Sequence, residues 1–374
     1  MASNDESSLH NGSDIFFDFS CSICHEKKRN TEAEFYCKEC FKFYCSKCME
    51  YHNYFVMKHV TFGKENISQW PQTSVDAQEQ SSSSDQLVEE YQPGSVSKPD
   101  PIIKVTSSKK FNVHIKGDSD KCYINGVCET SNGELLIIDF SNRKVKLLNQ
   151  TYKVVDHYEL PNHPVSMCSI DSSLVAVITF ESSVILFIRV TNGLLVLDRT
   201  LNLQQKCSGI AHHHGNLYIT SGTALYQYTV DGTLLNKFND DRSGLLESSS
   251  CAVSPDGERI YVAYKTYLYK TSQCIGELVT LSRDGKVIAK LTDPALCWFV
   301  TFSPGLHVTD SGQVLVCEVF CRIIYQMGRD GRQKLTEVVK SKKKVPLSVF
   351  FSKRTGSLIM GMYDSKNIMV FKAQ

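Results

Sequence analysis

The sequence predicts a mostly β protein, in which a six-bladed β-propeller follows a small N-terminal domain of a different kind. Two observations lead to this prediction. From about residue 102, short apolar alternations are separated by dipeptides such as Asn132-Gly133 and Asp284-Gly285, which are typical of tight hairpin turns. Ahead of that region, six of the fifteen cysteines fall between Cys21 and Cys48. Such a cluster indicates a small domain held together by its cysteines.

The composition is that of an ordinary globular protein, with 42% hydrophobic and 22% charged residues. The chain has no run of eighteen apolar residues and starts with a polar, acidic segment, so we expect neither a membrane-spanning helix nor a signal peptide. We therefore expect a cytoplasmic protein with no membrane partner, with the nucleus as an open alternative. In a reducing compartment, clustered cysteines are more often metal ligands than disulfides.

The segment from 21 to 59 carries three Cys-x2-Cys pairs followed by two histidines. Eight such ligands suffice for two tetrahedral Zn2+ ions and leave no coordination position for a reacting water, so both sites are expected to be structural. A segment this short buries too little apolar surface to fold alone, so metal binding must supply most of its folding free energy. The candidate ligands are Cys21, Cys24, Cys37, Cys40, Cys45, Cys48, His52 and His59.

This pattern, with FYCKECFKFYCSKC at its centre, resembles the B-box zinc finger of tripartite-motif (TRIM) proteins. The resemblance covers residues 21–59 and implies that two zinc sites interleave in a cross-brace. We expect the finger to dock a partner or to self-associate. By this resemblance one zinc is held by Cys21, Cys24, Cys45 and Cys48, and the other by Cys37, Cys40, His52 and His59.

The chain is expected to divide into four parts. Residues 1–18 and the Ser-, Gln-, Pro- and acid-rich residues 62–101 are expected to be disordered, because they hold few apolar side chains. The finger occupies 19–61 and the propeller 102–374. TRIM relatives usually carry a coiled coil in place of this linker, but here the only helix-forming piece, near 85–92, is about two turns long.

Six units recur from Gly126 to the C-terminus at roughly forty-residue intervals, the period of four-stranded propeller blades. The last unit, from Pro346, is one strand short, and an unassigned strand lies ahead of the first unit at 110–115. If that strand pairs as the outermost strand of the last blade, the ring closes and two exposed sheet edges disappear.

Two of the units resemble NHL repeats. The segments DFSNRKV at 139–145 and DSKNIMV at 364–370 match the D-x-x-N-x-x-[VI] corner of that family. A B-box joined to an NHL-like propeller is the architecture of TRIM-NHL-like proteins. Many TRIM proteins owe their ubiquitin-ligase activity to a RING finger, and we expect none here, because the residues before Cys21 contain no cysteine.

The sequence contains no P-loop, G-x-G-x-x-G, G-x-S-x-G or H-E-x-x-H motif, so no catalytic residue is nominated and a non-enzymatic role is expected. We therefore interpret the protein as a zinc-binding adaptor whose propeller binds a protein partner. One alternative is RNA binding, because residues 102–374 carry 32 Lys or Arg against 24 Asp or Glu. A second alternative is an accessory role in a ubiquitin ligase. The candidate RNA-binding residues are Lys340, Lys342, Lys343 and Lys344.

Overall fold

The computed structural model describes residues 18–22, 24, 30–38, 42–49, 60–71, 100–238, 246–267, 273–299, 303–319 and 321–374. This part of the chain is mostly β, as expected. It divides into two compact units, with the described residues of the first inside Met1–Val96 and those of the second inside Ser97–Gln374. Within these residues, no helix has the length and apolar character needed to cross a membrane.

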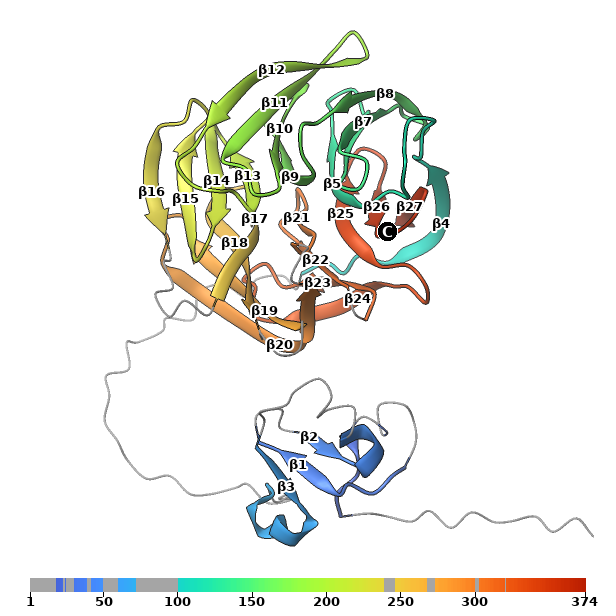
Figure 1. Ribbon diagram of the computed structural model, residues 1–374, viewed down its shortest axis with the longest axis vertical. Coiled ribbons are helices and arrows are strands. Elements are labelled where there is room, and N and C mark those ends of the chain that lie inside the picture. Colours follow the sequence, from blue (N-terminus) through green and yellow to red (C-terminus); the bar gives the residue numbers. More distant parts are fainter. Residues whose placement is uncertain are drawn as a thin grey trace, which may run out of the picture. The chain divides into compact units, whose positions relative to one another are not determined.

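The first unit is built on a three-stranded antiparallel sheet in the order β2–β1–β3 (Figure 1). The central strand brings Tyr36 opposite Phe43 of β2 on one side and opposite Phe62 of β3 on the other. These aromatic side chains form a core without any long helix. The elements are β1 (Phe35–Cys37), β2 (Lys42–Tyr44), β3 (Thr61–Gly63) and the 3₁₀ helix η1 (Lys64–Gln69).

Trp70 completes this small core. Its side chain is 3% exposed, and its indole N–H donates a hydrogen bond of 3.1 Å to the carbonyl oxygen of Phe62. Its ring packs against Phe19 and Phe43, with centroid distances of 5.1 and 5.5 Å. The boundary expected between finger and linker at residues 61 and 62 therefore falls inside β3. The prediction was wrong there because one buried aromatic among polar residues leaves no periodic signal.

We expect Trp70→Ala to destabilise the first unit by about 3–5 kcal/mol, since it removes the largest buried side chain of this core. Hydrogen exchange of the peptides covering residues 60–71, measured in denaturant, would report the loss. Ile67→Ala is a matched control in the same segment, because Ile67 is 49% exposed. Equal effects of both substitutions would contradict the packing role of Trp70.

The second unit consists of six four-stranded antiparallel sheets among the described residues. In five of them four consecutive strands lie side by side in chain order. The first two sheets are β5 (Ile124–Glu129), β6 (Leu135–Asp139), β7 (Lys144–Leu148), β8 (Val154–Glu159), and β9 (Pro164–Ser169), β10 (Leu174–Thr179), β11 (Val184–Thr191), β12 (Leu194–Asn202). The third and fourth are β13 (Gly209–His213), β14 (Asn216–Ser221), β15 (Ala224–Thr229), β16 (Leu234–Phe238), and β17 (Leu246–Val253), β18 (Arg259–Tyr267), β19 (Gln273–Ser282), β20 (Val287–Phe299). The fifth is β21 (Leu306–Val308), β22 (Val314–Glu318), β23 (Ile323–Met327), β24 (Lys334–Lys340).

The sixth sheet joins the two ends of the propeller region. It contains β25 (Pro346–Ser352), β26 (Ser357–Met362) and β27 (Asn367–Ala373), and its outer strand is β4 (Val105–Asn112). Asn112 of β4 lies opposite Asn367 of β27. The edge strand therefore starts earlier than the expected range 110–115, and its end differs because Val113 leaves the sheet and becomes fully buried.

The sheets pack in a ring around their first strands. β5 contacts β9, and the contacts continue through β13, β17 and β21 to β25, which contacts β5 again. Figure 1 shows these strands around the middle of the unit. The turn glycines fit the hairpins predicted from the sequence, because Gly133 and Gly285 have φ of 79° and 84°, which side chains with a Cβ rarely adopt.

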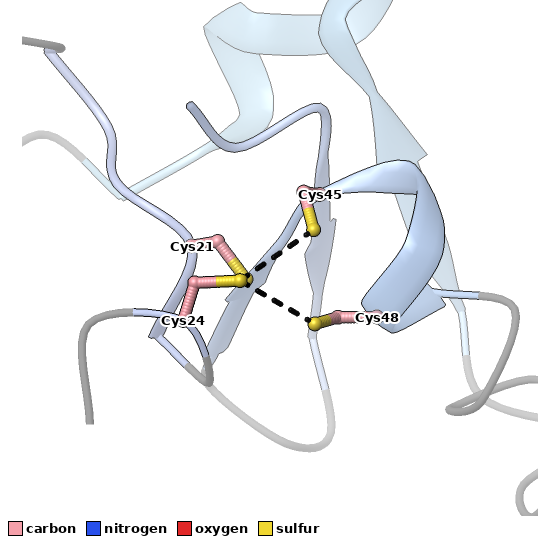
Figure 2. Close-up of side chains that lie close together, drawn as sticks. All are labelled: Cys21, Cys24, Cys45 and Cys48. Atoms are coloured by element: carbon pink, nitrogen blue, oxygen red, sulfur yellow. Dashed lines mark hydrogen bonds between the residues drawn. The ribbon is translucent and has the colours of Figure 1, made fainter. Parts of the chain in front are cut away.

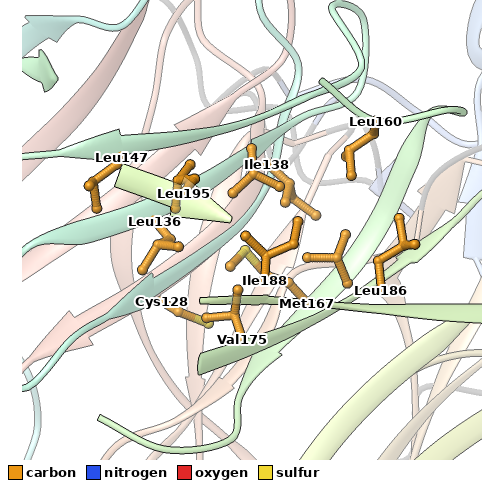
Figure 3. Close-up of a cluster of buried hydrophobic side chains, with 12 residues drawn as sticks. Cys128, Leu136, Ile138, Leu147, Leu160, Met167, Val175, Leu186, Ile188 and Leu195 are labelled. Carbon is orange, nitrogen blue, oxygen red and sulfur yellow. The ribbon is translucent and has the colours of Figure 1, made fainter. Parts of the chain in front are cut away.

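Strand alternation explains how each sheet packs against two neighbours. On β6, Leu136 and Ile138 point into a cluster shared with the next sheet, which Figure 3 shows, together with Met167, Val175 and others. Leu135 and Ile137 point the opposite way, into a cluster shared with the sixth sheet. Because both faces of the sheet are covered, all five residues of β6 are buried.

Candidate functional site

Four cysteines of the first unit surround one point (Figure 2). Cys21 and Cys24 precede β1, Cys45 follows β2 directly, and Cys48 lies in the helical turn after it. Their sulfur atoms all lie within 4.8 Å of one another. The fold thus gathers two Cys-x2-Cys pairs that are separated in the sequence by β1 and β2, and this group could bind a metal ion.

The sulfur separations fit a tetrahedral metal site. Cys24 Sγ lies 3.9 Å from Cys45 Sγ and 3.8 Å from Cys48 Sγ. A tetrahedron with zinc–sulfur bonds of about 2.3 Å has edges of about 3.8 Å. A disulfide would need a sulfur separation of about 2.05 Å. The four thiols therefore stand at the spacing of metal ligands.

Hydrogen bonds position the turn that carries Cys48. The Met49 N–H donates to the Cys45 carbonyl at 2.9 Å, which closes the turn. Glu34 caps its start, because the Ser46 N–H and hydroxyl donate to the two Glu34 carboxylate oxygens at 3.1 and 2.6 Å. These two hydrogen bonds lower the pKa of Glu34. The capped turn holds Cys48 facing Cys24.

The protonation of these thiols bears on metal binding, because the thiolate is the form that coordinates. A hydrogen bond with Thr31, with smaller contributions from the neighbouring thiols, lowers the pKa of Cys24 to about 7. Burial raises the pKa of Cys45 and of Cys48. A cation placed among the four sulfur atoms would reverse that effect of burial, since it stabilises every thiolate it contacts.

Only part of the second expected ligand set can be placed. Cys37 ends β1 and is fully buried beside Tyr44 and Met49. Its three expected partners, Cys40, His52 and His59, lie outside the described residues. The structure therefore brings together the four cysteines expected at one site and locates one of the four residues expected at the other.

A second group with metal-ligand chemistry lies in the propeller, where Asp118, Cys122 and Asp139 converge. A lysine fills this group. Lys146 Nζ lies 2.6 Å from Asp118 and 2.7 Å from Asp139, and all three side chains are 0% exposed. The same ammonium donates to the Val113 carbonyl at 3.0 Å. The positive charge of this group therefore comes from the protein itself.

This ion-paired group connects the two ends of the ring. Asp118 and Val113 belong to the segment that leaves β4, whereas Asp139 and Lys146 belong to the first sheet. Asp139 is also the first residue of the D-x-x-N corner, and it accepts a hydrogen bond of 2.8 Å from the Asn142 amide. Sequence reasoning missed the role of Lys146, because in the sequence it is an ordinary polar residue in a strand.

The first strands of the six sheets enclose a cavity of about 380 Å³. Three shielded polar atoms on its lining residues have no hydrogen-bond partner among the described residues: Asn125 Oδ1, Ser250 Oγ and His307 Nε2. Burial lowers the pKa of His307 to about 4, so its imidazole is neutral at physiological pH. These three atoms could bind water or a small polar molecule, and the acidic residues Glu129 and Asp310 also line the cavity.

The lysines proposed for RNA binding lie at the end of β24 and in the loop that follows it. Lys340 pairs with Glu337 at 3.1 Å. Lys342 and Lys343 are exposed and Lys344 is half-buried, and none of these three forms an ion pair within the described part of the chain. They present positive charge to solvent from one loop.

No protein-family model matches the chain, and no curated protein matches its sequence. Among solved structures, a streptogramin B lyase superposes with a TM-score of 0.50 at 12% identity, over 72% of this chain and 98% of the lyase. A catalytically inactive virginiamycin B lyase from Staphylococcus aureus with quinupristin gives 0.48 at 13% identity, over 71% and 99%. A chain of a mitotic checkpoint complex gives 0.48 at 11% identity, over 78% and 98%.

These similarities concern the fold. The streptogramin B lyase structure and the sheets described above identify the second unit as a β-propeller, which confirms that part of the prediction. One protein with this fold is an enzyme by its name, so the fold by itself does not support the expectation of a non-enzymatic protein.

Proposed function

We propose that the protein is a zinc-binding adaptor of the TRIM type. In this proposal a B-box-like finger holds two Zn2+ ions, and a six-bladed NHL-like propeller binds a protein partner. The observation that carries the proposal is the group of four thiols around Cys24, at sulfur separations of 3.8 and 3.9 Å.

The finger acts as a structural module. Cys21, Cys24, Cys45 and Cys48 hold one zinc, and Cys37 with the three ligands expected beside it holds the other. Zinc bound by four protein ligands cross-links the chain and has no free position for a substrate. The reducing cytoplasm or nucleus keeps the thiols available for the metal.

The propeller acts as a rigid platform. Its six sheets are the six blades, and β4 closes the ring by completing the sheet of β27. Loops on such a scaffold are held at fixed positions, which favours recognition of a large partner. The cavity of about 380 Å³ is lined by residues from the first strands of all six sheets, so it offers polar groups from every blade to a bound segment.

RNA binding remains the second candidate. The exposed Lys342 and Lys343, with no ion pair to a described residue, are the observation that favours it.

The experiment recovers the full chain from cells after chemical crosslinking, and after ultraviolet crosslinking in parallel. We expect mass spectrometry to identify protein adducts at loops of the second unit. We also expect the parent protein to recover no more RNA than the variant Lys342→Glu/Lys343→Glu. Specific RNA adducts at those lysines without protein adducts would replace the adaptor by the RNA-binding candidate. Ubiquitin chains formed by the purified protein with loading enzymes would overturn the non-enzymatic reading.

A further inference from the structure

The propeller has two ends with different loops. In each antiparallel sheet, the loop after the second strand and the connection to the next sheet lie at one end, and the loops after the first and third strands lie at the other. Backbone hydrogen bonds join the loop after the second strand to the connection that enters the same sheet. Examples are the Phe140 N–H to the Tyr123 carbonyl (2.8 Å) and the Phe180 N–H to the His163 carbonyl (2.7 Å). We call these ends the connection face and the turn face.

The positive charge of the propeller is concentrated on the connection face. Its described loop residues include nine Lys or Arg against four Asp or Glu, whereas those of the turn face include seven against eight. Two cations of the connection face are already paired, Lys121 with Asp364 and Lys206 with Glu181. Six further cations are exposed and form no ion pair with a described residue: Lys116, Arg143, Arg322, Lys342, Lys343 and Lys366.

A row of aromatic side chains crosses the same face. Phe140, Phe180 and Tyr363 each follow the second strand of their sheet, and these three sheets are neighbours in the ring. Tyr123 packs on Tyr363 with a centroid distance of 4.3 Å, and His163 stacks on Phe140 at 4.7 Å. Phe180 is 45% exposed. An apolar stripe therefore lies among unneutralised cations.

The arrangement of the rings indicates the class of partner. Single-stranded nucleic acids bind by stacking bases on open aromatic faces. Here Tyr123 and Phe140 each have one face covered by a partner ring, so fewer faces are left for bases to stack on, and Phe180 is the most exposed ring of the stripe. Aromatic residues and arginine are enriched in protein–protein interfaces, and surrounding lysines at the rim add electrostatic attraction for an acidic partner.

We propose that the connection face docks an acidic segment of a partner protein that carries aromatic or aliphatic side chains among its carboxylates. This rests on the proposed adaptor function and names the partner's chemistry. The cations around the stripe attract the carboxylates, and Phe180 with its neighbouring rings buries the apolar side chains of the segment.

The test uses the full-length zinc-loaded protein and defined probes: a random copolymer of glutamate and tyrosine, polyglutamate, and a single-stranded oligouridylate. Binding is measured by fluorescence anisotropy at low and moderate salt. We expect the copolymer to bind more tightly than polyglutamate. Arg143→Glu/Lys366→Glu should weaken copolymer binding by about tenfold, and Phe180→Ala by about fivefold.

The control reverses two charges of the turn face, Arg283→Glu/Lys286→Glu, whose side chains are 74% and 83% exposed. We expect this variant to bind as the parent does. If both charge-reversal variants weakened copolymer binding equally, the proposal would be overturned, because the electrostatic attraction would then not depend on the connection face. Tighter oligouridylate binding that is lost with Arg143→Glu/Lys366→Glu would also overturn it, in favour of nucleic acid. If these binding tests contradict the proposal but crosslinking in cells still yields protein adducts, the adaptor function holds and the partner docks on a surface other than the connection face.

Discussion

Cys24→Ser is expected to remove one zinc ion from each chain and to unfold the first unit, while the second unit melts as before. Cys24 lies at the spacing of a zinc ligand from two other sulfur atoms, so its loss leaves an incomplete tetrahedron. Structural zinc contributes about 10–16 kcal/mol in small finger domains, which exceeds what a core of this size can supply. Elemental analysis and circular dichroism of protein made in zinc-replete cells measure both effects.

The matched control is Cys321→Ser, since Cys321 is exposed and lies in the propeller. It should keep the full metal content of the parent. Parent protein without stoichiometric metal, or with an ion bound in an open site, would refute the structural zinc sites. If Cys24→Ser kept all its metal, the group of four cysteines would have to be abandoned as a site. If chelation of the parent also abolished the melting transition of the second unit, the two units would not be independent.

The second large effect is expected for Lys146→Met, which should destabilise the propeller by about 3–5 kcal/mol. The substitution removes the ammonium that lies 2.6 and 2.7 Å from the buried carboxylates of Asp118 and Asp139, and within the described part of the chain only Asp118 keeps a second cation, Lys144 at 3.3 Å. The contact between the segment after β4 and the first sheet would weaken first. Thermal and urea unfolding of the second unit report the loss.

The pH dependence of the propeller's stability tests whether the ion pairs of Lys146 cause this effect. Burial alone would raise the pKa of Asp118, but the hydrogen bond and charge of Lys146 outweigh it and lower the pKa. Asp118 therefore contributes stability above its unfolded pKa of about 3.9, and this contribution disappears as the pH falls through the lower folded value. In Lys146→Met the carboxylates lack that partner, so the stability difference from the parent should shrink as acid protonates them.

At alkaline pH the ion pairs of Lys146 predict a loss of stability as the pH rises. Burial alone would lower the pKa of Lys146, but the charge of Asp139 outweighs it and the pKa is raised. The contribution of Lys146 is complete below its unfolded pKa of about 10.4 and is lost as the pH rises through the folded value.

Two variants separate charge from packing. Lys153→Met changes an exposed lysine of a turn and should alter stability by no more than about 0.5 kcal/mol. Lys146→Met/Asp139→Asn removes the carboxylate that Lys146→Met leaves without a cation, while the amide oxygen can still accept the hydrogen bond of 3.1 Å from the Tyr123 N–H. The double variant should recover part of the lost stability. No recovery would mean that the ion pairs are not the source of the effect.

Local patterns in the sequence predict much of the candidate metal site. The Cys-x2-Cys spacing nominates Cys21, Cys24, Cys45 and Cys48 as ligands, because a short loop places two thiols near one centre. Spacing alone leaves open which pairs share an ion, and the pairing above came from the resemblance to B-box fingers. The fold brings these four sulfur atoms within 4.8 Å by means of the β1–β2 pairing.

Trp70 and β4 show where local patterns fail. Trp70 stands in a polar stretch, so nothing nearby reveals that Phe19 and Phe43 lie against it. The missing strand of the last unit did point to a pairing partner ahead of the first unit, but the ends of that strand depend on where Val113 enters the core.

The sequence by itself determined the mostly β class, the hairpin turns and the candidate thiol ligands, since each arises from residues close together in the chain. Only the tertiary structure decided that Lys146 is buried between Asp118 and Asp139, because Asp118 reaches it through β4, which pairs with β27 at the far end of the chain. The charge of the connection face was equally invisible, since it is the sum over loops that lie apart in sequence and meet at one end of the ring. The count of strands predicts that the ring closes, but it does not predict which side chains from distant segments meet there, because those contacts depend on the register and packing of the closed sheets.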